Sequence, residues 1–333
     1  MYSRFSVFYV VTLLCALVGC GSSGSDTNSN NTGGGNTSKG EVRNQSTVMS
    51  SSDQICSEAA TTGQRPDLNY MPPISSPRYP SDSGPNIVVD AGHNNFHTIR
   101  NRYCMFAMSL RTDGYRVNEN YDALTSNNLA QTDIYVIANA RPSADQTADE
   151  TFSESEIEAL KNWVIDGGRL MFIIDHPNFL EGSVKLADAL GFTVIERSAL
   201  IPGKPAPYQF DKESGLLKDH AITDGSIGQP ISKFTTFSGS AFWAPDEADI
   251  LLQFPENSIG RRVIDGMLIE EDISGALQGA VLQFGLGKIA MFSEAGAFTA
   301  QINIRGLPMG MGHEDASENS LFLLNVMHWL ALN

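Results

Sequence analysis

The apolar positions between residue 86 and about residue 200 follow two periods in turn, that of strands and that of helices. Strands are predicted where short apolar runs have few exposed positions, as in parallel sheets covered on both faces: residues 86–92, 133–141 and 169–177. The clearest helix spans residues 153–168. Ser153 suits its N-cap, Glu156 follows three residues later, and a Gly-Gly pair ends the run.

The second half of the chain changes to strands in succession and then to one apolar helix. The expected strands fall within residues 248–254, 262–271 and 279–298, and the last range contains a Gly-Leu-Gly turn. In the closing helix, Leu323, Met327 and Leu330 share one stripe. This order predicts an α/β fold of the flavodoxin-like, doubly wound kind, with a mostly parallel sheet and an antiparallel C-terminal extension.

The first 85 residues differ from the rest in composition. Residues 1–20 carry one early positive charge and a short apolar stretch, which indicates a secretory signal. Residues 21–85 are rich in Gly, Ser and Asn and then in Pro, so we expect a disordered tether. Residues 86–333 are then long enough for a single α/β domain.

The end of the signal, "LVGC", resembles the lipobox of bacterial lipoproteins. This resemblance implies cleavage before Cys20 and acylation of its thiol, so that the protein is held to the membrane of the cell envelope and faces the periplasm or the cell surface. An ordinary secretory signal that ends in Cys is the alternative. No Asp follows Cys20, and the resemblance therefore favours the outer membrane.

The net charge limits the kinds of partner that the protein can bind, and the cysteine positions allow one disulfide. The formal net charge of −16 argues against nucleic acid, which demands a basic surface. Beyond the signal and Cys20, the chain has Cys56 and Cys104, in a compartment that permits disulfides. Either the two pair, or Cys104 is a buried thiol.

Polar side chains follow the predicted strands at their carboxyl ends, where open parallel sheets bind ligands. We expect these groups to converge on a small polar ligand. The candidate acids, bases or metal ligands are His93, His97, Asp175, His176 and Glu294. The candidate ligand-binding residues are Asp90, Asn94, Asn95, Asn139, Arg141 and, before the last helix, His313, Glu314 and Asn319.

Four of these residues also have a structural interpretation, whereas Glu294 is less easily explained as structural, because a carboxylate at a buried strand end needs a partner. Asn94 and Asn95 suit helix caps, His97 suits a helix start, and Asp175 suits a turn. His93 and His97 are four residues apart, which permits a divalent metal shared with Asp90 or Asp175. No dense ligand motif of known spacing is present. The cofactor is therefore left open, and a metal is not favoured.

Several segments together resemble the class I glutamine amidotransferase-like superfamily over residues 86–331. They are "DIYVIANA", "EIEALKNWVIDGGRLMFIIDH", "LKDHAITDG", "GKIAMFSEAGAF" and "LFLLNVMHWL". In particular, the chain resembles bacterial envelope proteins akin to auxiliary domains of gliding-motility transporters. In working amidotransferases, the strand after the Gly-Gly turn ends in an elbow with a nucleophilic Cys. Here Asp175 or His176 stands there, so the resemblance implies no Cys-dependent glutaminase.

Three classes of function fit these patterns. The first is a hydrolase or lyase that acts on a small polar ligand such as a sugar, because carboxylates and imidazoles suit general acid–base catalysis. The second is a non-catalytic binding domain at the same strand ends. The third is a transporter-associated partner with a vestigial site. Polar groups at buried strand ends carry a desolvation cost, which favours a ligand site over a vestigial one. Between an enzyme and a binding domain the patterns are nearly balanced, and we expect an enzyme.

Overall fold

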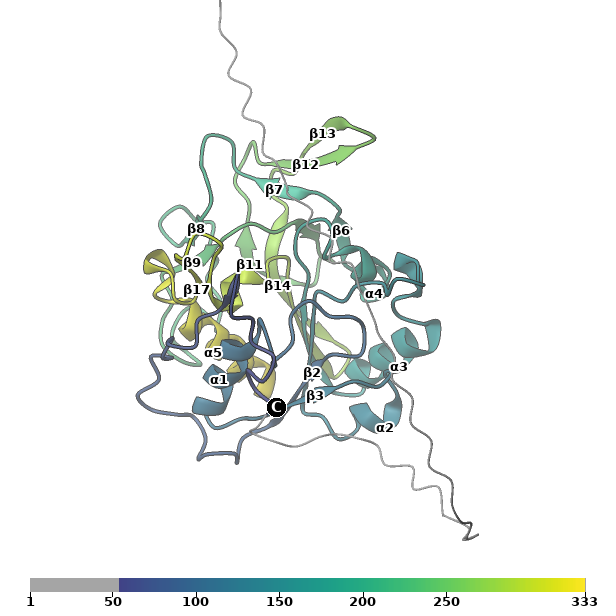
Figure 1. Cartoon of the computed structure of the whole chain (residues 1–333), viewed down its shortest axis with the longest axis vertical. Coiled ribbons are helices and arrows are strands. Elements are labelled where there is room, and N and C mark those ends of the chain that lie inside the picture. The colour runs from purple at the N-terminus through teal and green to yellow at the C-terminus, as the bar shows by residue number, and fades with distance from the viewer. Residues whose placement is uncertain (1–53, 333) are drawn as a thin grey trace, which may run out of the picture. The chain divides into compact units, whose positions relative to one another are not determined.

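The computed structural model describes residues 54–332. The predicted signal, Cys20 and the first part of the predicted tether lie outside the described residues. Within residues 54–332, nine strands form one central sheet, and five of them are parallel neighbours in the order β3-β2-β4-β5-β15 (Figure 1). Their bounds are β2 Asn86–Asp90, β3 Arg116–Asn120, β4 Ile134–Ala138, β5 Arg169–Ile173 and β15 Gly287–Phe292.

Antiparallel strands extend this sheet beyond β15. Strand β14 pairs with β15, β10 and β11, and β10 pairs with β6. Their bounds are β6 Thr193–Ile195, β10 Ala241–Trp243, β11 Asp249–Gln253 and β14 Leu277–Phe284. The α/β class, the large, mostly parallel central sheet and the antiparallel strands are thus confirmed.

Three smaller antiparallel sheets complete the strands of the described residues. One joins β1 Arg65–Pro66, β16 Ala300–Ile302 and β17 Pro308–Gly310. Another joins β7 Ser198–Leu200, β12 Ile259–Ile264 and β13 Met267–Asp272, and the third joins β8 Tyr208–Asp211 and β9 Lys233–Thr236. The β12–β13 hairpin projects away from the central sheet (Figure 1).

Helices cover both faces of the central sheet (Figure 1). Helices α1 Cys104–Thr112 and α5 Asn319–Ala331 lie on one side, and α2 Ser126–Leu129, α3 Glu154–Ile165 and α4 Val184–Ala189 lie on the other. Short 3₁₀ turns are η1 Ala148–Glu150, η2 Glu181–Ser183, η3 Gly296–Phe298 and η4 Glu314–Ala316. None of the helices in residues 54–332 has both the length and the apolar character that a bilayer crossing requires.

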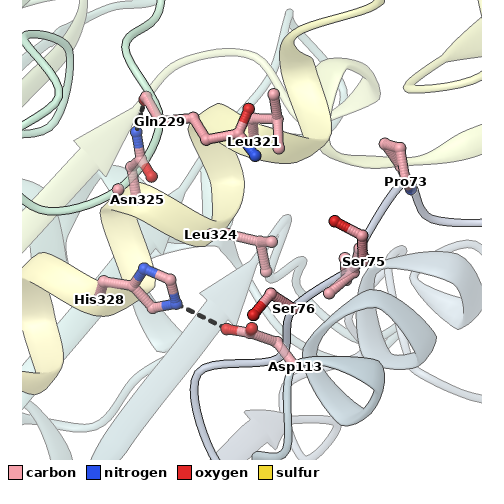
Figure 2. A pocket seen from close by; sticks show the side chains of 11 residues that line it. Pro73, Ser75, Ser76, Asp113, Gln229, Leu321, Leu324, Asn325 and His328 are labelled. Atoms are coloured by element: carbon pink, nitrogen blue, oxygen red, sulfur yellow. Dashed lines mark hydrogen bonds and ion pairs between the residues drawn. The ribbon is translucent and has the colours of Figure 1, made fainter.

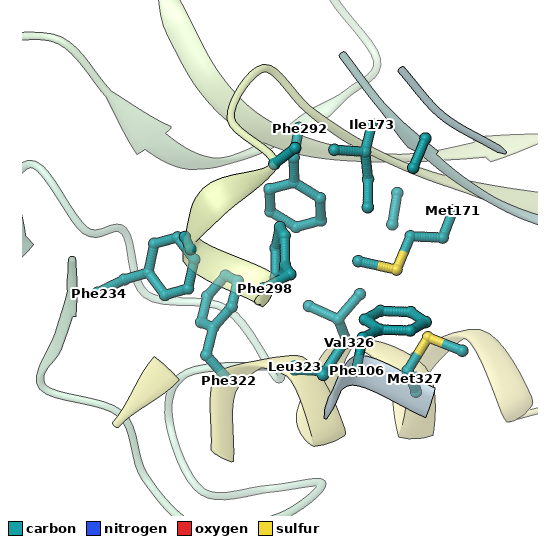
Figure 3. Packing of buried hydrophobic residues seen from close by; sticks show 14 of the residues in the cluster. Phe106, Met171, Ile173, Phe234, Phe292, Phe298, Phe322, Leu323, Val326 and Met327 are labelled. Carbon is teal, nitrogen blue, oxygen red and sulfur yellow. The ribbon is translucent and has the colours of Figure 1, made fainter. Parts of the chain in front are cut away.

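The period of two along each strand divides the core into two layers. On β2, Ile87 and Val89 pack in the cluster with α1 and α5, whereas Val88 packs in the cluster with α3 and α4. Figure 3 shows Leu323 and Met327 of α5 close to side chains of the sheet. The predicted apolar stripe of the last helix is fully buried, which confirms that prediction.

Residues 54–85 are folded against the domain, although their composition predicts a tether that continues to residue 85. Cys56 forms a disulfide with Cys104 of α1, and β1 pairs with β16. Tyr70, Ile74 and Tyr79 pack against the core. The composition of the segment, which is rich in Pro overall, does not reveal the few residues that hold it to the domain. The prediction of a disordered tether is therefore wrong for residues 54–85. The disulfide also decides between the two interpretations of Cys104.

Candidate ligand pocket at the strand ends

A pocket of about 230 Å³ lies at the carboxyl ends of β5 and β15 and beside the loop that follows β2. It brings together four of the five candidate acids and bases: His97, Asp175, His176 and Glu294. Apolar side chains and polar side chains complete its wall: Phe96, Phe179, Phe237, Met309, Gln64, Ser238 and Gln301. The pocket therefore combines titratable groups with an apolar, largely aromatic surface.

Strand register explains why two carboxyl groups meet in this pocket. Strands β5 and β15 are parallel, and Ile173 is paired with Phe292. Asp175 and Glu294 each lie two residues beyond that pair, so the two side chains emerge next to each other at the same edge of the sheet. Both are buried, with exposed fractions of 6% and 2%.

Backbone N–H groups, rather than cations, hold the two carboxyl groups. Asp175 accepts hydrogen bonds from the N–H of His176 at 2.7 Å and of Ala295 at 3.3 Å. Glu294 accepts them from the N–H of Gly296 at 3.0 Å and of Ala297 at 2.6 Å. Within residues 54–332, no lysine or arginine forms an ion pair with either group. A Cβ at residue 296 would lie 2.8 Å from Glu294 Oε1, so glycine allows this close approach.

Burial without a cation changes the protonation of the pair. Burial, and then the neighbouring Asp175 carboxyl, raise the pKa of Glu294 to about 8. Burial also raises the pKa of Asp175. Glu294 is therefore mostly protonated at neutral pH and can donate a proton.

His97 is a neutral hydrogen-bond donor in this pocket. Burial, followed by the positive charges of Arg102 and Arg141, lowers its pKa to about 3. The side-chain amide of Asn139 donates from Nδ2 to His97 Nδ1 at 3.0 Å. Because Nδ1 accepts this bond, the neutral ring carries its proton on Nε2. Asn139 also lies close enough to Asp175 to lower the pKa of that carboxyl group against the larger effect of burial, so it is a neighbour of both groups.

His176 has the opposite tautomer. Its Nδ1 lies 2.9 Å from the carbonyl oxygen of Pro177, which can only accept, so Nδ1 donates. The neutral ring then has a free electron pair on Nε2. One cavity thus contains a proton donor, Glu294, and a ring nitrogen that can accept a proton, which is the pairing that general acid–base catalysis requires.

His93, Asp90 and Asn95 lie in a separate buried cluster and do not line this pocket. His93 Nδ1 lies 2.9 Å from both carboxylate oxygens of Asp90, and its Nε2 lies 3.0 Å from Glu156 Oε1. Asn95 Nδ2 donates to Asp90 Oδ2 at 2.9 Å. The His93 ring also stacks on Phe152, with centroids 4.1 Å apart.

The positive charge of His93 lies between two carboxylates in this cluster. Burial opposes protonation of His93, but the carboxylates of Asp90 and Glu156 outweigh it and raise the pKa of His93 to about 9. Both ring nitrogens are already bonded. We call Asp90, His93 and Glu156 the tie cluster, because they join the end of β2 to the start of α3.

Asn94 and Arg141 line an open groove of about 420 Å³, together with Asn178 and Glu181. Asn94 donates from Nδ2 to the carbonyl of Pro142 at 3.0 Å. Arg141 donates from Nε to the carbonyl of Asn94 at 3.2 Å. Arg141 also contacts Phe96 of the pocket wall, with its guanidinium carbon 5.0 Å from the ring centroid.

The three candidates before the last helix do not line the pocket. His313 Nδ1 accepts a hydrogen bond from the N–H of Asp315 at 3.1 Å and caps η4. Its ring lies behind the pocket wall, 5.3 Å from the centroid of Phe237. Glu314 is exposed. Asn319 is buried and bonds the backbone of Thr235 at 3.0 and 2.7 Å, so it ties α5 to β9.

The apolar wall and Gln64 were not predicted from the sequence. Phe96 stands between two of the candidate residues, and Phe179 follows His176 by three positions. Aromatic residues near the predicted strand ends were therefore an available signal. Gln64 carried no such signal, because it belongs to the segment that was expected to be a tether.

A second cavity, of about 260 Å³, lies between α5 and residues 73–76 (Figure 2). Its ionisable side chains are those of Asp113 and His328, and Asp113 Oδ2 lies 2.6 Å from His328 Nε2. Asp113 also accepts a hydrogen bond from the N–H of Arg78 at 2.8 Å. Here the acid is paired with a base of the protein, whereas the acids of the strand-end pocket are not. The described residues contain no group of three or more His, Cys, Asp or Glu placed to hold a metal ion.

Comparison with known proteins shows the fold. No protein-family model matches the chain, and a search of the curated proteins gives no match. Among solved structures, the chain is similar to the mmIFT52 N-terminal domain, with a TM-score of 0.54 and 16% identity over 74% of this chain and 98% of that one.

Two further neighbours belong to the glutamine amidotransferase-like class. One is a ThuA-like protein from Bacteroides uniformis ATCC 8492, with a TM-score of 0.41 and 12% identity over 79% of this chain and 94% of that one. The other is a GMP synthase protein from Thermoplasma acidophilum, with a TM-score of 0.42 and 12% identity over 74% of this chain and 94% of that one.

Proposed function

We propose that this protein is a lipid-anchored cell-envelope protein whose amidotransferase-like domain acts as a hydrolase or lyase on a small polar ligand such as a carbohydrate. One observation carries the proposal. A protonated carboxyl group, Glu294, shares a cavity with an imidazole nitrogen that can accept a proton, His176. Asp175 and His97 complete the set.

The roles of these groups follow from their protonation. Glu294 would protonate a leaving oxygen, and His176 Nε2 would accept a proton from the ligand or from a water molecule. Nε2–H of His97 would donate a hydrogen bond to a hydroxyl or carbonyl oxygen. The rings of Phe96 and Phe179, with centroids 4.4 Å apart, supply an apolar face of the kind that ligand pockets combine with a few polar groups.

Cysteine chemistry is excluded from this proposal. The cysteines of residues 54–332 are Cys56 and Cys104, and these are joined in a disulfide. We therefore expect no Cys-dependent glutaminase activity. Treatment with iodoacetamide should leave any turnover intact, and loss of turnover after alkylation would contradict this.

The envelope location has two supports. The disulfide suits an oxidising compartment, and "LVGC" at the end of the predicted signal resembles a lipobox. Replacing Cys20 with Ser should move the protein from the membrane fraction to the soluble fraction and abolish labelling with fatty acid. A Cys20→Ser protein that stays in the membrane fraction with full labelling would contradict lipidation.

We also propose that the domain has the flavodoxin-like fold and is related to domains of transporter-associated envelope proteins. In chain order, the parallel strands lie 2-1-3-4-5 across the sheet, which is the flavodoxin-like order. This order supports a flavodoxin-like domain. The alternative function, which rests on the sequence resemblance to transporter-associated envelope proteins, is a non-catalytic ligand-binding or transporter-associated lipoprotein that uses the same pocket.

Turnover of methyl glycosides, compared with binding of the parent sugars, tests the proposal. Methoxide is a poor leaving group that needs a proton from a general acid, so an enzyme should release the free sugar, and Glu294→Gln should lower kcat about 100-fold or more while it retains sugar binding. Glu158→Gln, an exposed carboxylate on α3, is the matched control and should keep wild-type turnover. Sugar binding without any turnover would favour the binding protein. Equal turnover in wild type and Glu294→Gln would exclude Glu294 as the acid.

A further inference from the structure

Two arginines lie against one aromatic side chain of the pocket wall. The guanidinium carbon of Arg102 is 4.2 Å from the centroid of Phe96, and that of Arg141 is 5.0 Å from it. Arg102 precedes α1, whereas Arg141 follows β4, so the fold brings the two together from separate loops. We call these two residues the arginine pair.

The arginine pair has no acidic partner among residues 54–332. Other arginines in the same part of the chain do have one. Arg197 binds Glu271 at 2.8 Å, and Arg262 binds Glu196 at 3.2 Å. Glu181 lines the same groove as Arg141, but it binds Arg262 at 3.3 Å instead.

Some other arginines of residues 54–332 also form no ion pair, but Arg102 and Arg141 lack one although they lie against the same ring, in a chain whose formal net charge is −16. Arg102 is partly buried, and burial, followed by the charge of Arg141, lowers its pKa. Two positive charges that are partly shielded from water repel each other, and an anion bound beside them lowers the energy of this repulsion. The protein supplies no such anion in its described residues.

Donors for an anion remain on both side chains. Arg102 uses Nη1 to bind Gln301 Oε1 at 3.1 Å, and Gln301 itself lines the pocket. Arg141 uses Nε to bind the carbonyl of Asn94. The two Nη groups of Arg141 form no hydrogen bond within residues 54–332. A planar guanidinium presents two parallel N–H groups, which match the two oxygens of a carboxylate and equally suit a phosphate or sulfate.

We propose that the ligand of the strand-end pocket carries an anionic oxygen group, such as the carboxylate of an acidic sugar, and that Arg102 and Arg141 bind that group. This rests on the proposed function. The anion would lie beside Phe96, while the neutral polar part of the ligand reaches Asp175, His176 and Glu294. The arginine pair would then determine specificity between charged and neutral ligands, and it would take no part in proton transfer.

Binding of three probes by titration calorimetry tests the proposal: glucuronate, glucose 6-phosphate and glucose. In low salt, wild type should bind at least one charged probe about tenfold or more tightly than glucose, and added salt should reduce this preference. Tighter binding of glucuronate would assign a carboxylate, and tighter binding of glucose 6-phosphate would assign a phosphate.

Variants show whether the arginine pair causes the preference. Arg102→Gln and Arg141→Gln should each weaken binding of the charged probe about tenfold and leave glucose binding unchanged. Arg261→Gln is the matched control, because Arg261 lies on the β12–β13 hairpin and pairs with Glu270. It should change neither. If no charged probe binds more tightly than glucose, or if the two variants retain the preference, the inference is wrong.

These outcomes are separable from those of the proposed function. Turnover that depends on Glu294, without any preference for a charged probe, would leave the proposed function intact and overturn the arginine assignment. Binding of a charged probe that depends on Arg102 and Arg141, without turnover of any glycoside, would support the arginine assignment and favour a binding protein.

Discussion

The tie cluster and the strand-end pocket both bury carboxyl groups and imidazoles, but they pair them differently. In the tie cluster, the carboxylates of Asp90 and Glu156 lie on either side of one imidazolium, that of His93. In the pocket, the carboxyl groups of Asp175 and Glu294 lie next to each other and bind backbone N–H groups. In the first arrangement one positive charge lies between two negative charges and offsets one of them, whereas in the second Glu294 is mostly protonated at neutral pH and carries little charge.

This difference separates a structural role from a chemical one. Removing one partner of a buried ion pair leaves an uncompensated charge, which is strongly destabilising. A buried carboxyl group without a cation already lowers the free energy of unfolding of the wild-type protein. Such groups are found most often at sites where a protein binds or transforms a ligand. We therefore expect the two regions to respond in opposite ways to the same kind of substitution.

The largest expected effect is on stability when His93 is replaced. His93→Gln leaves the buried Asp90 and the partly buried Glu156 without their cation, and the free energy of unfolding should fall by about 3–5 kcal/mol. Glu294→Gln, the matched change in the pocket, should alter it by less than about 1 kcal/mol or raise it, because no ion pair is broken. Urea-induced unfolding at pH 7 measures both. Equal losses in the two variants would remove the distinction between the regions.

A smaller effect is expected on the pH dependence of stability. The pKa of Glu294 is about 8 in the folded protein against an ordinary value of 4.5, because of burial and then Asp175. The folded state thus binds the proton more tightly, and stability falls as the pH rises from 4.5 to 8. The stability of Glu294→Gln relative to wild type should therefore increase between pH 6.5 and 8, by at most about 1.4 kcal/mol per pH unit.

That pH range separates the pair of Glu294 and Asp175 from the two histidines with shifted pKa values. The pKa of His97 is lowered to about 3, so its effect, a rise in stability with pH, is complete by about pH 6.5. The pKa of His93 is raised to about 9, and its contribution is lost as the pH rises from 6.5 through 9 in both proteins, so it cancels in the difference. Parallel curves for wild type and Glu294→Gln would show that Glu294 is ionised in the folded state.

The sequence predicted the strands and their polar ends well, but not how the polar residues divide between the two regions. Buried runs such as residues 169–173 are recognisable locally, and so is the capping box of Ser153 and Glu156. By contrast, His93 and His97 are only four residues apart, yet His93 belongs to the tie cluster and His97 lines the strand-end pocket. Asn94 between them has a positive φ of 47°, and the loop turns there.

Partners far along the chain account for the rest of the difference. His93 meets Glu156, which is 63 residues away, whereas His97 meets Asn139, which is 42 residues away. No local pattern encodes these distances, since they depend on how strands and helices are assembled. Gln64 was missed for the same reason, because the pairing of β1 with β16 brings a segment of polar composition to the pocket.

The smallest expected effect concerns the helix cap that orients the tie cluster. Ser153 accepts a hydrogen bond from the N–H of Glu156, and Glu156 Oε2 accepts one from the N–H of Ser153 at 3.0 Å. Oε1 of the same carboxylate is the atom that binds His93. Ser153→Ala should therefore lower the free energy of unfolding by about 1 kcal/mol, and less in a His93→Gln background, because both changes act through one carboxylate.

Thr147→Ala is the matched control, because its capping partner Glu150 is exposed. It should lower the free energy of unfolding by a smaller amount, and by the same amount in both backgrounds. Strictly additive losses for Ser153→Ala and His93→Gln would mean that the cap and the tie cluster are independent.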